Sequence, residues 1–199
     1  MQHDPHTALG GAIYHVIGEK GIEPHPVTNE LLPHVLTSWE VADPSGTTLV
    51  FKVKQGLKIH NMAPWNGREF NAEDVAWNME RIGGLYADRL KIPKASFQRA
   101  TMVGNIQKAQ AIDPYTVKVT LSKPNSSFFN GLMDTRVPFA PKEMDDIGWN
   151  DPLKMGGIGP YQISEWVKDQ KMNYKKHPNY FRPGEPSFDA ANRSEEHHV

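Results

Sequence analysis

The chain has 199 residues, of which 38% are hydrophobic and 23% are charged, so it can bury a core as one domain or two small ones. Its formal net charge of -1 excludes an overall field that would attract nucleic acid or an anionic membrane. The lack of cysteine excludes disulfides, thiolate metal sites and a cysteine nucleophile, and no apolar run reaches the roughly 20 residues that span a bilayer.

The first predicted elements are a short helix and a hairpin. Ala12–Glu19 is predicted to be helical because its apolar residues fall on one side. Ser38–Val41 and Thr47–Lys54 are predicted strands, joined by the turn sequence Asp-Pro-Ser-Gly at 43–46. The second strand alternates, and its apolar face carries Leu49, Phe51 and Val53. This pattern favours an antiparallel sheet with one buried and one solvated face.

A helix is predicted to start at Asn71, a residue that accepts hydrogen bonds from the free amides of a first helical turn. Glu73 and Asp74 place negative charge at the positive end of the helix dipole, so we interpret them as capping charges rather than an acid–base pair. Gly83 and Gly84 end the helix.

Two further hairpins and one helix complete the predicted elements. Ile106–Ile112 and Tyr115–Leu121 form one hairpin, and Gly159–Trp166 with Lys171–Lys175 forms the other. Asn125–Met133 is predicted to be a short helix capped by its first residues. The pattern indicates an α+β fold of antiparallel hairpins with few helices, and not the regular strand–helix alternation of a doubly wound sheet.

Seven short stretches, in one order along the chain, resemble the motifs of a known family. They are Asp4–His6, Leu36–Glu40, Thr47–Lys58, Gly67–Val75, Asp113–Val117, Gly156–Tyr161 and Asn179–Phe181. The chain resembles family 5 of the bacterial extracellular solute-binding proteins, which includes dipeptide, oligopeptide and nickel receptors. Glu80-Arg81 resembles the pair that ends the family's capped helix. Two departures are Ile158, where the family usually has threonine, and the loop His60–Asn66.

The resemblance implies part of a type II periplasmic-binding-protein fold, namely most of the first lobe with its appended subdomain. On this basis, residues 1–30 are the first segment of lobe I and residues 31–155 the appended subdomain. Residues 156–190 are the return segment of lobe I, and residues 191–199 form a tail that does not match the family. Members of the family are well over twice this length, and they enclose the ligand between two lobes.

The resemblance also implies a function. The parent protein would be the receptor of an ABC importer, which captures a peptide or a related small solute and docks on membrane permease subunits. It would make no covalent change, would need no cofactor and would bind no nucleic acid. It would work in the periplasm or outside the cell, with a lipid anchor on the full-length precursor as one of the alternatives. The first residues, Met1–His6, lack the basic and apolar regions of a signal peptide, so by themselves they indicate a cytoplasmic chain or a removed start.

The resemblance places the ligand-contacting loop directly after Asp-Pro-His, at Leu9, Gly10 and Gly11. Glycine permits a close approach of backbone to ligand, although a tight turn that only packs against the core is equally consistent with the sequence. Tyr14 offers a flat apolar ring with a polar end, which suits a cleft wall or a core. Tyr86 follows the capped helix and matches, by rough position, a place where the appended subdomain reaches the ligand.

The tryptophans and histidines admit other interpretations. Trp39, Phe51 and Trp166 are predicted in the core or in hairpins, whereas Trp65 and Trp77 are predicted on the surface or in a cleft. The nine histidines suggest a metal-dependent hydrolase, but no HExxH motif is present, and a catalytic zinc needs about three converging ligands. A third possibility is an isolated interaction or dimerisation module, which an exposed edge strand or apolar patch would support.

Overall fold

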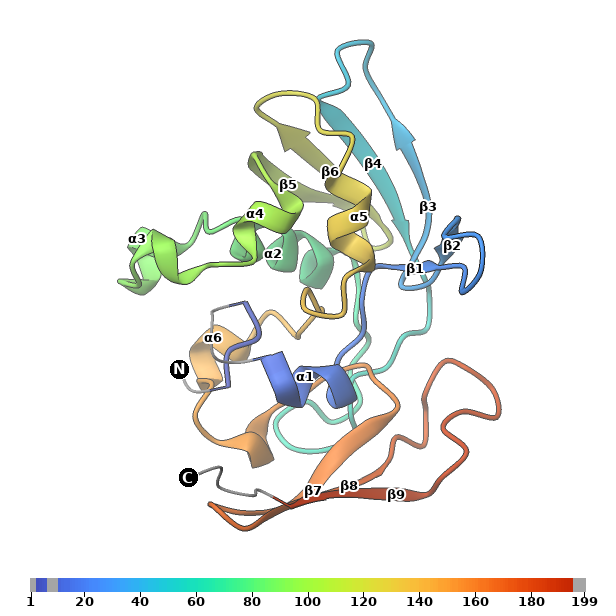
Figure 1. The fold of residues 1–199 in the computed structure, drawn as a ribbon, viewed down its shortest axis with the longest axis vertical. Coiled ribbons are helices and arrows are strands. Elements are labelled where there is room, and N and C mark those ends of the chain that lie inside the picture. Colours follow the sequence, from blue (N-terminus) through green and yellow to red (C-terminus); the bar gives the residue numbers. More distant parts are fainter. Residues whose placement is uncertain (1–2, 7–10, 195–199) are drawn as a thin grey trace.

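The arrangement of the sheets is the main feature of the computed structural model, which describes residues 3–6 and 11–194. Within these residues the strands form antiparallel sheets of two, four and three strands. Figure 1 shows the four-stranded sheet at the top, the three-stranded sheet at the bottom, and helix α1 (Gly11–Ile17) between them. No helix in this part of the chain is long and apolar enough to cross a membrane. The α+β prediction is confirmed.

The four-stranded sheet contains the first two predicted hairpins. Its strands lie in the order β3 (Leu36–Val41), β4 (Thr48–Val53), β6 (Thr116–Leu121) and β5 (Ile106–Asp113), and all neighbours are antiparallel. The predicted alternation holds, because the apolar positions of the two central strands are buried. These positions are Leu49, Phe51, Val53, Val117, Val119 and Leu121. The sheet therefore has one face in the core.

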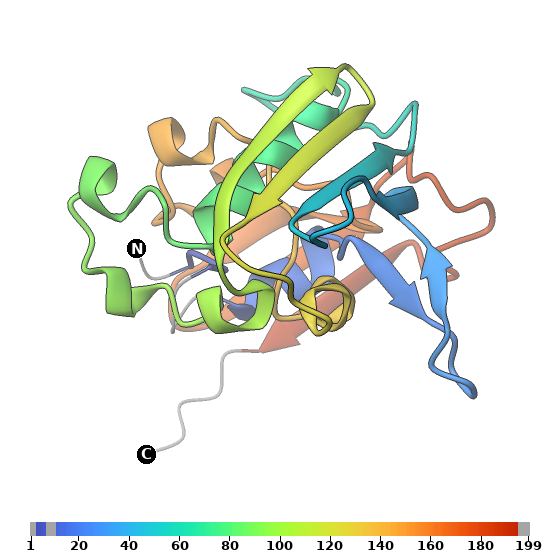
Figure 2. The same ribbon diagram turned by 90° about the horizontal axis from the view of Figure 1, so that it is seen from above.

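Helix α2 (Ala72–Ile82) packs against β5 and β6 and covers this inner face (Figure 2). Its start is the predicted one. The Asn71 side chain accepts from the Glu73 amide at 2.9 Å, and the Asp74 carboxylate accepts from the Asn71 amide at 3.0 Å. This reciprocal pair forms a capping box, so the interpretation of Asp74 as a capping charge is confirmed.

Between these elements lie short helices that the sequence did not predict. They are α3 (Ala87–Leu90), η1 (Lys94–Ser96), α4 (Ala100–Val103), α6 (Met144–Ile147) and η2 (Pro152–Lys154). The predicted helix at Asn125 is present as α5 (Phe128–Met133), but it begins later. The Asn125 side chain accepts from the Ser127 amide at 3.0 Å and so forms a turn ahead of the helix.

The three-stranded sheet consists of β7 (Tyr161–Val167), β8 (Lys171–Lys176) and β9 (Ala190–Ser194). β7 and β8 confirm the third predicted hairpin. β9 pairs antiparallel with β8 and lies largely within residues 191–199, which the sequence set apart as a tail. The division of the chain into lobe segments stays a prediction.

A small hairpin of β1 (Ile22–Pro24) and β2 (Leu31–Pro33) extends away from the body of the molecule in Figure 2. Its turn is closed by the His25 amide, which donates to the Glu30 carbonyl at 2.8 Å. Both strands have only three residues and end in proline. Neither is long enough to show an alternating pattern, so no local pattern predicts this hairpin.

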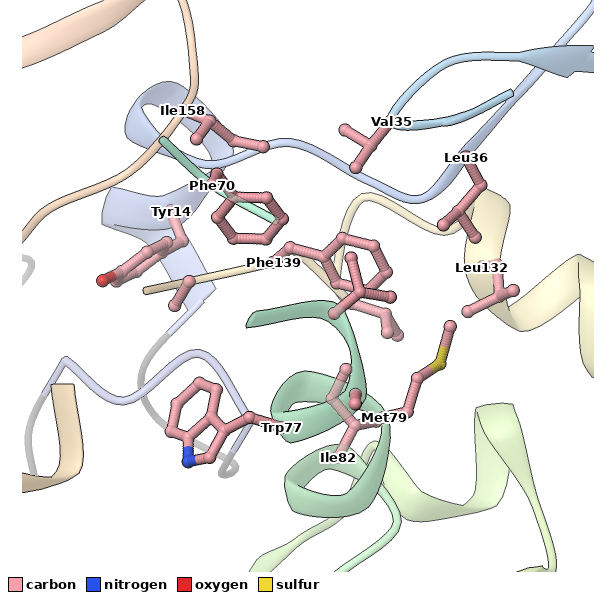
Figure 3. Close-up of a cluster of buried hydrophobic side chains, with 14 of the residues drawn as sticks. Tyr14, Val35, Leu36, Phe70, Trp77, Met79, Ile82, Leu132, Phe139 and Ile158 are labelled. Atoms are coloured by element: carbon pink, nitrogen blue, oxygen red, sulfur yellow. The ribbon is translucent and has the colours of Figure 1, made fainter. Parts of the chain in front are cut away.

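One apolar core joins the two larger sheets. Figure 3 shows its centre, where side chains from distant segments meet between α1 and α2. Phe70, ahead of α2, stacks on Phe139 with ring centroids 6.4 Å apart. Tyr14 of α1 and Ile158, ahead of β7, complete the same cluster. The N-terminal helix therefore packs against segments that lie far along the chain.

Two of the tryptophan predictions were wrong. Trp65 and Trp77 are only 4% and 8% exposed, and not in an open cleft. Trp65 packs over Gly156, where an added Cβ would lie 2.5 Å from the indole nitrogen. Trp77 lies on the inner side of α2 beside His6, with ring centroids 6.1 Å apart.

The other aromatic predictions are confirmed. Phe51 is fully buried on β4, and the half-buried Trp39 and Trp166 lie on β3 and β7.

Candidate functional site

The segment just ahead of α1 is held by a buried ion pair. Arg81, in the last turn of α2, donates to both carboxylate oxygens of Asp4, at 2.8 and 2.7 Å. Both side chains are 0% exposed. A two-pronged pair of this kind is strong and geometrically specific, and either charge alone would be costly to bury. The first described residues are therefore fixed to α2, 77 positions along the chain.

Arg81 is also bound from its other side. Its Nε donates to Asp145 Oδ1 at 2.8 Å, and its guanidinium lies 4.7 Å from the ring centroid of Trp149. Arg89 reaches the second oxygen of Asp145 at 3.2 Å, so this carboxylate is shared by two cations. Burial opposes the charge on Arg81, but the hydrogen bonds and charges of Asp4 and Asp145 outweigh it and raise the pKa of Arg81.

His6 completes this cluster as a neutral ring. Its Nε2 lies 3.1 Å from the Pro138 carbonyl oxygen, and its Nδ1 lies 3.0 Å from the Arg81 guanidinium. A carbonyl oxygen can only accept and a guanidinium can only donate, so the proton belongs on Nε2. Burial and then the charge of Arg81 lower the pKa of His6 to about 3. The ring is thus uncharged at neutral pH, and its two nitrogens link Arg81 of α2 to the carbonyl of Pro138.

Helix α1, which follows residues 7–10 in the sequence, packs on the glycine-rich loop 156–159. The Tyr14 hydroxyl donates to the Gly156 carbonyl at 3.0 Å, and the Gly159 amide donates to the Ile17 carbonyl at 2.8 Å. A Cβ on Gly157 would lie 1.9 Å from the Ile17 carbonyl oxygen, so only glycine permits this approach. The chain is therefore held in place both before and after the predicted ligand loop.

The predicted site residues lie in two places. Leu9 and Gly10 lie outside the described residues, and Gly11 is the first residue of α1. Tyr14 is 0% exposed and belongs to the core. Tyr86 is half-buried at the start of α3. The structure brings Gly11 and Tyr14 together on one helix and leaves Tyr86 on another element.

Tyr86 is nevertheless linked to the buried cluster. Its hydroxyl donates to Glu80 at 2.7 Å, and the Arg89 guanidinium lies 4.1 Å from its ring centroid. Burial and the bond to Glu80 raise the pKa of Tyr86. Because Arg89 also contacts Asp145, a continuous series of charged contacts runs from Tyr86 to Arg81 and Asp4.

A small cavity opens beside α1. It has a volume of about 80 Å³, and its lining residues include Tyr14, His15, Lys20, Thr135 and Pro138. Pockets that enclose a whole small ligand usually measure about 300–1,000 Å³. This cavity can therefore take a few waters or one small group of a ligand, and it forms at most one wall of a larger site.

A second polar cluster joins the β1–β2 region to the loop after β8. Glu19 accepts from the Tyr180 hydroxyl at 2.5 Å and lies 2.7 Å from His34 Nε2. Arg182 pairs with Glu23 and lies 3.3 Å from His34 Nδ1. With Arg182 donating at Nδ1, His34 carries its proton on Nε2 and donates to Glu19. The cluster is internally paired and serves to hold two segments together.

Sequence reasoning missed the central residue of the first cluster. Arg81 was noted only as part of a motif, and Asp145 and Trp149 were not noted at all. One signal was available: a charged residue in each of two motifs, Asp4 and Arg81, could have suggested a pair. No group of three or more histidine, aspartate or glutamate side chains within the described ranges could hold a metal ion.

The fold and the comparisons with known proteins identify the class of protein. The described residues have the fold of solved type II periplasmic-binding proteins. The family model described as bacterial extracellular solute-binding proteins, family 5, middle region, matches residues 30–192. The chain therefore belongs to the bacterial extracellular solute-binding proteins of family 5.

Among curated relatives, the chain is similar to the glutathione-binding protein GsiB of Escherichia coli strain K12. The two are 31% identical over 160 residues, which are 80% of this chain and 29% of that protein. The chain thus spans less than a third of the length of this relative. The same match is found with GsiB of Shigella boydii.

Among solved structures, the chain resembles the periplasmic binding protein DppA of Helicobacter pylori in complex with the peptide STSA. The TM-score is 0.76 with 27% identity, and the match covers 96% of this chain and 40% of that one. NikA of Brucella suis in complex with Fe(III)-EDTA gives a TM-score of 0.78 with 20% identity over 98% of this chain and 37% of that one. The fold and family predictions are confirmed.

Proposed function

We propose that this chain forms the ligand-receiving part of the first lobe of a solute receptor that serves an ABC importer. The observation that carries the proposal is the buried Asp4–Arg81 pair, which fixes the backbone immediately ahead of the predicted ligand loop. A loop that must present main-chain groups to a ligand needs both of its ends fixed, because an ordered site loses less entropy on binding. The packing of α1 on the loop 156–159 fixes the other end of the predicted ligand loop.

The solute is proposed to be a short peptide or a related small molecule. Glutathione and a peptide are the ligands named for two of the similar proteins. In our proposal, Leu9, Gly10 and Gly11 pair through their main chain with an extended ligand, in the manner of strand addition. The cavity beside α1 is a small subsite that the buried Tyr14 supports from the core, and Tyr86 contacts the solute from the side of α3.

The rest of the proposal concerns the parent protein. A second lobe would close over the solute by a hinge motion, and the closed receptor would dock on permease subunits in the membrane. The receptor would act in the periplasm or outside the cell, with lipid anchoring as one arrangement, and would catalyse no reaction. The large exposed apolar side chains in the described part of the chain belong to separate segments and give no specific support to a dimerisation module. They are Val27, Val41, Ile112, Leu153 and Phe188.

The test is an amide NMR titration of the isotope-labelled chain with glutathione and pooled di- to pentapeptides. We expect shifts at the amides of residues 9–11, and none with free amino acids of the same composition. Thermal unfolding gives a second measure. A ligand at a hundred times its Kd stabilises by about 2.7 kcal/mol, which raises Tm by roughly 5–11 °C for a chain of this size. No amide shift and no Tm change at millimolar peptide would refute the proposal that this part of the receptor binds the solute.

A further inference from the structure

Two buried histidines lie outside the proposed site and face each other. His60 lies in the loop between β4 and α2. His177 directly follows β8. They are 0% and 1% exposed, and their rings meet edge to face with centroids 4.8 Å apart. The two segments that carry them are more than a hundred residues apart in sequence.

Both rings bind the same carbonyl oxygen. His60 Nε2 lies 3.2 Å and His177 Nδ1 lies 3.1 Å from the oxygen of Gly159. A carbonyl oxygen has two lone pairs and no proton, so it can accept from both rings only if each of these nitrogens carries hydrogen. The geometry thus assigns the Nε2–H form to His60 and the Nδ1–H form to His177.

The two remaining ring nitrogens are then unprotonated and buried. His60 Nδ1 and His177 Nε2 have no hydrogen-bond partner among the described residues. A proton on either nitrogen would create an imidazolium whose new N–H has no acceptor in the protein. Burying such a charge without a partner is strongly unfavourable. The closed arrangement therefore requires both rings to be neutral.

The pair also fastens the loop that seats α1. Besides the two ring contacts, the His60 amide donates to the Gly157 carbonyl at 3.0 Å, and the His177 amide donates to the Pro160 carbonyl at 2.8 Å. This loop carries the glycines that touch Ile17 at the end of α1. The same two segments line a polar groove of about 480 Å³, which includes the side chains of Asn61, Asn66, Asn179 and Tyr180.

We propose that His60 and His177 form an acid-released latch, which ties the loop before α2 and the end of β8 to the glycine loop under α1. The latch is closed while both rings are neutral and opens when either ring takes up a proton. Opening would weaken the packing of α1 on the loop 156–159, and it would also free the two segments that line the polar groove. The inference concerns the chain itself and does not rest on the proposed ligand.

The electrostatic surroundings support this behaviour. Burial and then the neighbouring His177 lower the pKa of His60 to about 3, with the bond to Gly159 opposing, and burial lowers the pKa of His177. No carboxylate contributes to either shift.

Only a carboxylate could stabilise an imidazolium at the latch, and the carboxylates on the surrounding elements have partners elsewhere. Asp74 pairs with Arg68, Glu19 binds Tyr180 and His34, and Glu69 accepts from the Gly56 amide and the Tyr115 hydroxyl.

The direct test is histidine NMR on the full chain labelled with ¹⁵N, titrated from pH 7.5 to pH 5. The long-range proton–nitrogen pattern of each ring distinguishes the two neutral tautomers. We expect His60 protonated at Nε2 and His177 at Nδ1, with neither titrating while its folded signal persists. An opposite tautomer, or titration of either ring in the folded chain near the ordinary pKa of about 6.5, would overturn the proposal.

A variant series gives the second measure. His60→Gln and His177→Asn each keep an amide N–H near the position from which the ring donates, but neither can take up a proton. Below about pH 6, a histidine that is neutral in the folded chain is protonated in the unfolded chain. Each such histidine lowers the folding equilibrium constant by up to about tenfold for every unit by which the pH falls. Urea unfolding measures this pH dependence. In the double variant, the change of the folding constant per pH unit should be smaller than in the wild type by up to about a hundredfold, and in the exposed control His15→Gln it should be the same as in the wild type. Equal pH slopes for the wild type and the double variant would refute the latch. If the double variant does not fold, the tautomer measurement decides.

Discussion

Replacing Arg81 by methionine tests the cluster on which the proposed site depends. The change keeps much of the side-chain length but leaves the Asp4 carboxylate, 0% exposed, without its cation. Breaking a buried pair from one side typically costs about 3–5 kcal/mol. The total stability of a domain is only about 5–15 kcal/mol. The variant should therefore lose a fifth or more of its stability in urea unfolding at pH 7.5.

A double-mutant cycle separates the pair from the surrounding packing. Asp4→Asn removes the charge that Arg81→Met leaves unpaired, so the double variant should be less destabilised than the sum of the two single variants. Arg136→Met is the control, because Arg136 is 54% exposed in its pair with Asp134 and should matter little. A loss below about 1 kcal/mol for Arg81→Met, or strictly additive effects, would refute the reasoning.

Three further changes test other parts of the structure. Gly157→Ala should destabilise the chain strongly, because its Cβ would lie 1.9 Å from a carbonyl oxygen at the end of α1. Gly56→Asn should cost less in the same urea unfolding, because an added Cβ meets nothing within 4 Å and asparagine tolerates the positive φ of 77° better than other side chains. His6 has a pKa of about 3 in the folded chain, below its unfolded value of about 6.5. The stability that the neutral ring contributes is therefore full above pH 6.5 and is lost as the pH falls. His6→Gln should reduce the number of protons taken up on unfolding at acidic pH, which the pH dependence of the unfolding free energy measures, by up to one. Asn71→Ala should cost about 0.5–2 kcal/mol through the lost cap, and an equal loss for Asn61→Ala, in an exposed loop, would contradict that assignment.

The larger elements could be predicted because their signals are local. The alternation of Thr48–Val53 and the cap at Asn71 each lie within one short window of sequence, and both were correct. β1 and β2 have three residues each, too few for a period to show. β9 depends on its pairing with β8, which no local pattern reveals.

The candidate site could be predicted only in part. The resemblance predicts a ligand loop at Leu9–Gly11, but the sequence did not reveal that Arg81 holds Asp4, ahead of that loop. In the sequence, Arg81 looks like an ordinary cation at the end of a helix, where cations are favourable anyway. Only the fold shows that it is fully buried and shared by Asp4 and Asp145. Trp65 was misjudged for the same reason, since its partner Gly156 is 91 positions away.

The packing of α1 on the loop 156–159 also has a consequence for the order in which the chain folds during synthesis. Tyr14 donates to Gly156 across 142 positions of sequence, so α1 is synthesised long before its packing surface exists. At roughly 5–20 residues per second, the helix waits for about 7–30 s. The hairpins β3–β4 and β5–β6 close over much shorter distances, and such local contacts form first. During synthesis the four-stranded sheet can therefore fold while α1 has not yet packed against Gly156.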